Sequence, residues 1–195
     1  SSTFSWEVAS FDGSKIIASN GMTATIKTAN DNLRSAEFVF ILGSWGTEHY
    51  HNKKLTAWLR KRVRAGERIC GVELGSYIVA RAGLLDGKLA TIHWSWLNGF
   101  KENFNRVEVE ESLFTLDRKV MTCSGGLAGV DLMLRLIEEI NGSSFSGEIA
   151  DQMLHHPIRS AISPQRGTMG RSTETMRPLL REAMTLIENN IEEPL

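Results

Sequence analysis

The stretch ERICGVELGSYIVARAGLLDGKLATIHW, residues 67–94, predicts a strand, a tight turn, a helix, a second turn and a second strand in one run. Ile69 and Cys70 are expected to close a short apolar strand, and Gly71 permits a sharp bend. Apolar residues then recur at helical spacing on one face: Leu74, Ile78, Val79 and Ala82. A side chain at such an elbow projects from the carboxyl end of the sheet, beside a helix N-terminus, where a thiol tends to have a lowered pKa. We therefore expect Cys70 to react faster than Cys123.

Three short motifs in this stretch carry a family resemblance: Cys70-Gly71, AGLLDG at 82–87 and ATIHW at 90–94. Together they resemble the class I glutamine amidotransferase-like domain that forms the sensor half of certain AraC-type transcription regulators. The domain is similar in fold to the intracellular-protease and Parkinsonism-associated protein families, whose elbow cysteine is a nucleophile or redox sensor. The resemblance implies an α/β fold, a flavodoxin-like three-layer sandwich with a mainly parallel central sheet.

Length, charge and cysteine content bound the class of protein. The chain has 195 residues and 42% hydrophobic content, which suffices for one sizeable core. Its net charge of −1 shows no overall basic excess of the kind that nucleic-acid-binding domains carry. Cys70 and Cys123 both sit in strand-to-glycine contexts that need no disulfide. With no apolar run near the roughly 18 residues of a membrane span and no signal pattern, we expect a soluble cytoplasmic protein without a membrane partner.

Composition divides the chain into three parts. Residues 1–166 read as the ligand-sensing domain, although the first strand and helix that the resembled regulators carry are absent. Residues 167–175 lack periodicity and are rich in Gly, Ser, Thr and Arg, as in a linker. Residues 176–195 resume helical spacing and resemble the opening helix of a double helix-turn-helix domain, truncated here. DNA binding is therefore expected only through the full-length C-terminal domain, and the regulator class implies a homodimer.

A small-molecule site is predicted at the carboxyl edge of the sheet. Residues 37–42, EFVFIL, predict a strand buried on both faces, and the turn Gly43-Ser44-Trp45-Gly46 opens toward the same edge as the elbow. The resulting crevice is bordered by the candidate ligand-binding residues: Trp45, Cys70, Gly71, Glu73, His93 and Trp94. The alternative for Trp45 is a ring packed over the sheet edge.

The effector class follows from two observations. Trp45 and Trp94 with Glu73, one turn into the predicted helix, offer aromatic faces and a carboxylate, which attract an alkylated cation. Separately, the segment from Ile158 to Arg166 with the CSGG run at 123–126 resembles regulators that respond to amino-acid-derived or quaternary-ammonium metabolites. The alternative is that both tryptophans pack in the core and Glu73 points to solvent.

Other chemistries have weaker support. A cysteine-dependent hydrolase or amidase would use Cys70 with His93, but Gly71 follows the cysteine where hydrolytic relatives can place a histidine, and the acidic partner is not in the chain. We therefore expect no enzyme activity. His49, His51, His155 and His156 complete no metal-ligand set and are expected on the surface, and no nucleotide-binding motif predicts a cofactor.

A basic helix is predicted after the Trp45 turn. Residues 53–65 place Leu55 and Leu59 on one face, and Lys and Arg residues follow the other side. Such a run is more often a solvated face than a nucleic-acid contact, and both interpretations stay open.

Overall fold

The computed structural model describes residues 4–11, 15–18, 20–26 and 28–166. Contacts separate residues 1–165 from residues 166–195, and of the second unit only Arg166 is described. The predicted linker at 167–175 and the predicted helix at 176–195 therefore lie outside the described residues. No helix in the described ranges is long and apolar enough to cross a bilayer.

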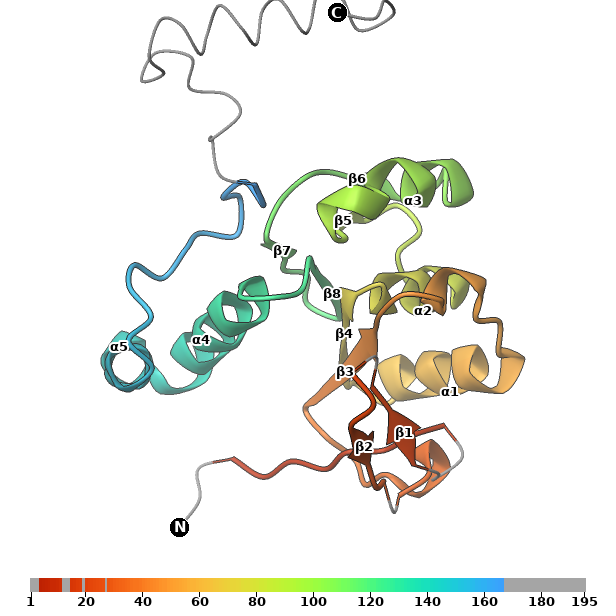
Figure 1. Cartoon of the computed structure of the whole chain (residues 1–195), viewed down its shortest axis with the longest axis horizontal. Helices are drawn as coiled ribbons and strands as arrows, with labels where there is room; N and C mark the ends of the chain where they lie inside the picture. The colour runs from red at the N-terminus through yellow and green to blue at the C-terminus, as the bar shows by residue number, and fades with distance from the viewer. Residues whose placement is uncertain (1–3, 12–14, 19, 27, 167–195) are drawn as a thin grey trace, which may run out of the picture. The chain divides into compact units, whose positions relative to one another are not determined.

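A four-stranded sheet forms the centre of the first unit (Figure 1). It contains β3 (Phe38–Gly43), β4 (Arg68–Glu73), β8 (Val120–Cys123) and β7 (Phe114–Thr115), in that spatial order. The first three strands are parallel, and β7 runs antiparallel to β8. This mainly parallel sheet confirms the predicted α/β class.

Helices cover both faces of this sheet, and each face has its own apolar cluster. On one face, α1 (Lys53–Arg64) and α2 (Gly75–Arg81) contribute residues such as Leu59 and Val79. On the other face, α4 (Ala128–Asn141) contributes Leu132 and Leu136, and α5 (Ser143–Gln152) packs beside α4 (Figure 1). The three layers confirm the flavodoxin-like sandwich.

Smaller elements join these layers: β1 (Ile16–Ile17), β2 (Thr23–Ala24), β5 (Leu89–Ala90), β6 (Glu108–Val109), α3 (Leu97–Asn103), and the 3-10 turns η1 (Asn30–Asn32), η2 (Thr47–His49) and η3 (Trp94–Trp96). β1 and β2 form an antiparallel hairpin, whereas β5 and β6 pair in parallel beside α3. The second strand predicted in the run 67–94, expected over residues 89–94, is thus shortened to its first two residues.

Local sequence explains why α1 begins and ends where it does. The Asn52 side chain accepts hydrogen bonds from the backbone amides of Lys54 and Leu55, both at 3.0 Å, which satisfies two of the free N–H groups of the first turn. Leu55 and Leu59, one turn apart, are buried against the sheet. Gly66 then adopts a φ of 97°, which lets the chain reverse into β4.

Two strand predictions were wrong. β3 was expected to be buried on both faces, but it is the edge strand of the described sheet, and Leu42 is 74% exposed. Phe4, Trp6 and Val8 alternate with polar neighbours, which predicts an edge strand at residues 4–9, yet these residues have no strand structure, and Trp6 is 83% exposed. Alternating apolar residues form a stable strand only beside a partner, and the described residues supply only an isolated bridge between Ser10 and Ala29.

Candidate functional site

Glu73 occupies the elbow between β4 and α2. It is the last residue of β4, and its φ of 54° lies in the left-handed region that residues with a side chain rarely adopt. The next residue, Leu74, donates its backbone N–H to the carbonyl oxygen of Gly43 at 3.2 Å. The elbow is thereby tied to the end of the neighbouring strand.

Two glycines permit this close approach. A Cβ atom on Gly75 would lie 1.9 Å from the carbonyl oxygen of Ile41, and one on Gly43 would lie 2.4 Å from the backbone nitrogen of Gly75. Any side chain at either position would push α2 away from β3. The elbow geometry is therefore fixed by contacts between two segments about thirty residues apart.

The prediction that Cys70 forms the elbow was wrong. Cys70 lies inside β4, opposite Phe40 and Met121 on its neighbours, and is fully buried in the α4-facing cluster. Gly71 does not bend the chain; a Cβ atom there would lie 2.8 Å from the Ser76 Cα, so this glycine makes room for α2. Burial, with a smaller contribution from Cys123, raises the pKa of the Cys70 thiol far above its ordinary range. A buried neutral thiol is a packing group rather than a nucleophile.

The Glu73 side chain lies against the turn that follows β8. A Cβ atom on Gly125 would come within 2.9 Å of the Glu73 Cβ, so this turn packs directly on the elbow. Glu73 is half-buried, and its carboxylate makes no hydrogen bond or ion pair with another residue that the structure describes. The elbow thus presents a carboxylate with unused acceptor capacity. It precedes α2, rather than lying one turn into the helix as predicted.

Trp45 is carried by the loop that leaves β3. Since Gly43 is paired with Glu73 in the register of β3 and β4, this loop begins beside the elbow. The Trp45 ring is 83% exposed, so it does not pack over the sheet edge. Arg81 of α2 holds the loop, because its guanidinium donates hydrogen bonds to the carbonyl oxygens of Thr47 at 3.0 Å and Tyr50 at 3.2 Å, and to that of Glu48.

His93 and Trp94 follow the strand β5. The Ser76 hydroxyl donates to the carbonyl oxygen of Thr91 at 3.2 Å, which places the chain before His93 alongside the start of α2. His93 Nδ1 lies 2.7 Å from the Ser95 hydroxyl, and its ring centroid is 5.4 Å from that of Trp94. Trp94 is 44% exposed. Both side chains therefore reach the surface.

The structure does not assemble the Cys-His pair of a hydrolase. Cys70 packs in the α4-facing cluster, where its Sγ lies 3.9 Å from the carbonyl oxygen of Gly71, whereas His93 Nδ1 lies 2.7 Å from the Ser95 hydroxyl. Of the six predicted ligand-binding residues, four have side chains at the surface, while Cys70 and Gly71 are buried. The four are Trp45, Glu73, His93 and Trp94.

A buried carboxylate that was not predicted as a site fastens the end of the first unit to α4. Asp131 is fully buried; it lies 2.8 Å from His155 Nε2 and accepts hydrogen bonds from the backbone N–H, Nε and Nη2 of Arg159 at 2.7–2.9 Å. Burial alone would raise the pKa of Asp131, but the bonds from His155 and Arg159 outweigh it and hold the pKa below its ordinary value. The expectation that His155 is a surface histidine was wrong, since its side chain is 17% exposed. His156 is 55% exposed and pairs with Asp151. The sequence signal was an acidic residue within the apolar stripe of a helix.

Gln165 was also missed as an anchor. Its side-chain Nε2 lies 2.8 Å from the carbonyl oxygen of Ile92, 2.9 Å from that of Ser112 and 3.1 Å from the Thr91 hydroxyl. The last residue of the first unit is therefore bonded to the chain just before His93. No periodic pattern in the sequence marks such a contact.

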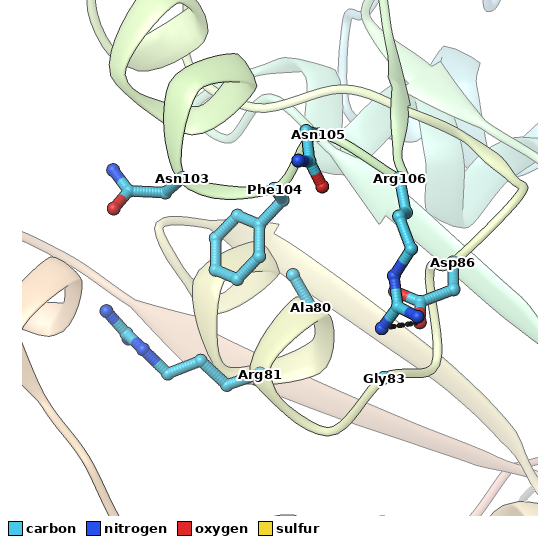
Figure 2. Close-up of a pocket in the computed structure, with 8 residues that line it drawn as sticks. All are labelled: Ala80, Arg81, Gly83, Asp86, Asn103, Phe104, Asn105 and Arg106. Carbon is cyan, nitrogen blue, oxygen red and sulfur yellow. Dashed lines mark ion pairs between the residues drawn. The ribbon is translucent and has the colours of Figure 1, made fainter.

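A cavity of about 270 Å³ lies at the other end of α2 (Figure 2). Figure 2 shows Arg106 pointing to Asp86, with 2.6 Å between Arg106 Nη2 and Asp86 Oδ2. The cavity is lined by residues from α2, the turn after it and the end of α3: Ala80, Arg81, Gly83, Asp86, Asn103, Phe104, Asn105 and Arg106. None is a predicted ligand-binding residue, and its volume is below the usual range for ligand pockets. In the described part of the chain, no group of three or more His, Cys, Asp or Glu residues could hold a metal ion.

Known regulators resemble this chain along nearly its whole length. It is 34% identical over 192 residues to the HTH-type transcriptional regulator GbdR of Pseudomonas aeruginosa, a match that covers 98% of this chain and 52% of the relative. It is 32% identical over 192 residues to the regulator CdhR of the same species, covering 98% of this chain and 57% of the relative. The chain thus spans about half the length of these curated relatives.

Solved structures share the fold. An AraC family transcriptional regulator from Pseudomonas putida superposes with a TM-score of 0.70 at 20% identity, covering 77% of this chain and 82% of that one. A ThiJ/PfpI family protein from Pseudomonas syringae gives 0.67 at 22% identity, covering 94% and 74%. Residues 1–139 match the DJ-1/PfpI family. The chain belongs to the DJ-1/PfpI family, in a branch similar to HTH-type transcriptional regulators.

Proposed function

We propose that this chain is the ligand-sensing part of a transcription regulator, which binds a small metabolite at the carboxyl edge of its sheet and controls transcription through a C-terminal AraC-type helix-turn-helix domain. The observation that carries the site is Glu73, a half-buried carboxylate on a left-handed backbone with no partner among the described residues. The similarity to HTH-type regulators supports the transcriptional role.

Backbone strain supports a binding role for Glu73. A left-handed conformation costs a residue with a Cβ atom about 1–2 kcal/mol, and such strain clusters where a side chain must be held at a fixed angle. Glycine would avoid this cost at the elbow. A glutamate that accepts the strain and leaves its carboxylate unpaired is better explained by a ligand than by stability.

The surrounding side chains favour a cationic effector, such as an amino-acid-derived or quaternary-ammonium compound. Glu73 would neutralise the charge, while Trp45 and the exposed part of Trp94 offer ring faces. A cation over an aromatic face gains about 0.5–2 kcal/mol. His93, next to Trp94, would border the same crevice.

Calorimetric titration of this chain with glycine betaine, carnitine and arginine tests the proposal. We expect binding of at least one, weakened by Glu73→Gln and by Trp45→Ala. Glu102→Gln and Trp6→Ala are matched controls, because Glu102 is an exposed carboxylate elsewhere and Trp6 is 83% exposed, as Trp45 is. The cationic effector is excluded if none of the three compounds binds, or if the site and control variants behave alike.

The alternative is a cysteine-dependent hydrolase or amidase of the same fold. The chain is 27% identical over 100 residues to an isonitrile hydratase of Pseudomonas putida, covering 51% of this chain and 43% of the relative. This alternative predicts hydrolysis of amide or ester substrates at a rate that Cys70→Ala abolishes. Burial and the raised pKa of Cys70 favour the sensor instead.

We further propose that the protein acts in the cytoplasm as a homodimer, since two-fold DNA sites call for symmetric regulators. Sedimentation at tens of micromolar should give twice the mass of the 21.7 kDa chain. A sedimenting mass equal to that of one chain under these conditions would contradict the proposed dimer.

A further inference from the structure

The outer face of α1 carries a charge of a single sign. The helix has six basic residues and no acidic residue: Lys53, Lys54, Arg60, Lys61, Arg62 and Arg64. At about 100° per residue, all of these except Arg62 fall within an arc of about 120°. The opposite side carries Leu55 and Leu59, which are buried. The basic stripe therefore faces away from the core.

Most of this charge is not neutralised within the first unit. Arg62 pairs with Glu67, with 2.9 Å between Nε and Oε2, and Arg60 donates a hydrogen bond to the carbonyl oxygen of Ala82. Four further side chains are exposed and form no ion pair with any described residue: Lys53, Lys54, Lys61 and Arg64. Elsewhere, basic residues such as Arg68 and Lys88 are paired with carboxylates at 3.0 and 2.8 Å.

The stripe is also held rigidly. The Asn52 cap fixes the first turn of α1, and the bonds of Arg60 and Arg62 attach its middle and last turns to the rest of the unit. Twelve residues at 1.5 Å rise make a helix about 18 Å long. Since each strand of a duplex carries one phosphate per about 3.4 Å of its axis, a helix of this length spans the axial rise of about five base pairs.

We propose that the outer face of α1 is a phosphate-binding surface through which this unit contacts duplex DNA without reading its sequence. Three of the six basic residues are lysines, which are depleted at protein–protein interfaces, whereas lysine and arginine are both usual donors to phosphate. The one aromatic residue of α1, Trp58, is half-buried and lies under the Arg62 guanidinium at 4.9 Å. Because the whole chain has a net charge of −1 and α1 carries six basic residues, the rest of the chain is net acidic, which makes α1 the favoured side for contact with a polyanion.

This surface goes beyond the proposed function, because it adds a contact that the helix-turn-helix domain does not supply. It also explains how four like charges gather on one helix without acidic neighbours. An ordinary solvated face gains stability from i,i+4 pairs of opposite charge, and α1 has none.

The test is fluorescence anisotropy of this chain with a labelled duplex of arbitrary sequence at about 50 mM salt and above. The variant Lys53→Gln/Lys61→Gln/Arg64→Gln removes three charges from the stripe. The matched control, Lys101→Gln/Arg118→Gln/Lys119→Gln, removes three exposed charges elsewhere. Glutamine is a good helix former, so both variants should fold, which circular dichroism and urea unfolding verify.

We expect the stripe variant to bind at least about tenfold more weakly and to reduce the slope of log K against log salt by about 2–3, since each phosphate contact contributes about 0.9. The control variant should keep the wild-type slope. Equal losses in the two variants, or an unchanged slope in the stripe variant, would overturn the proposal. Competition by polyglutamate as strong as that by unlabelled duplex would also overturn the proposal, because the surface would then bind any polyanion.

Discussion

Replacing Asp131 by Asn should remove the strongest polar anchor of the first unit. The carboxylate is fully buried and meets His155 Nε2 at 2.8 Å and three N–H groups of Arg159 at 2.7–2.9 Å. Asn keeps the size of the side chain, removes the negative charge and turns one acceptor into a donor that faces other donors. Breaking one side of a buried pair costs about 3–5 kcal/mol.

The expected loss is near the lower end, about 3 kcal/mol, because the Arg159 side chain is 35% exposed and can recover water. For a chain of this size, 1 kcal/mol shifts the midpoint of thermal unfolding by about 2–4 °C, so a decrease of about 6–12 °C is expected. Urea unfolding followed by tryptophan fluorescence measures the free energy directly. The matched control is Glu138→Gln on the same helix, whose exposed pair with Arg135 should contribute about 0.2–0.5 kcal/mol.

The pH dependence gives a second readout. The folded-state pKa of Asp131 is lowered, so its contribution is present above the unfolded value of about 3.9 and is lost as pH falls through the folded pKa. The difference in stability between wild type and Asp131→Asn should therefore be constant from pH 7 to about 5 and shrink at lower pH. If Asp131→Asn destabilises no more than Glu138→Gln, or if the difference does not change with pH, Asp131 does not anchor residues 155–159 to α4.

Three other changes test the site. Cys70 and Cys123 should both react slowly with iodoacetamide in the folded protein, because burial raises the pKa of Cys70 strongly and that of Cys123 to about 11. Rapid labelling of Cys70 would show instead that its thiol is reactive. Arg81→Met should make the loop that carries Trp45 cleave faster in limited proteolysis, since three carbonyl oxygens lose their donor, and an unchanged cleavage rate would show that the loop holds itself. Glu73→Gly should raise the free energy of unfolding by about 1 kcal/mol by relieving the left-handed strain, and a decrease would mean that its contact with Gly125 matters more.

Elements set by neighbouring residues could be predicted from the sequence. The α1 helix follows from the spacing of Leu55 and Leu59 and from Gly66 after it. Two short apolar runs, residues 114–116 and 119–123, flank the turn-forming pair Asp117-Arg118, and this pattern predicts the hairpin of β7 and β8. The helix α4 follows in the same way from its apolar stripe. In each case the residues that predict the element also form it, within one short segment, so contacts with distant residues do not change the outcome.

Features set by distant contacts could not be predicted. The bend was expected at Gly71 because glycine permits bends, but the chain turns at Glu73, where Gly43 approaches Gly75 from another strand. A glycine that relieves crowding and a glycine that permits a turn look alike in a sequence. The partner of Asp131 is likewise set by packing, since Arg159 lies 28 residues away.

The displaced elbow changes what the fold can do. A thiol at this position could act as a nucleophile if it were ionisable and lay beside a base and a group that orients the base. With Glu73 there, the strained backbone presents a carboxylate, and the described residues provide no basic side chain to neutralise it. Such a group stabilises neither the core nor the surface, but it can bind an incoming cation without giving up an existing bond. This elbow geometry therefore supports the ligand-binding role proposed for Glu73.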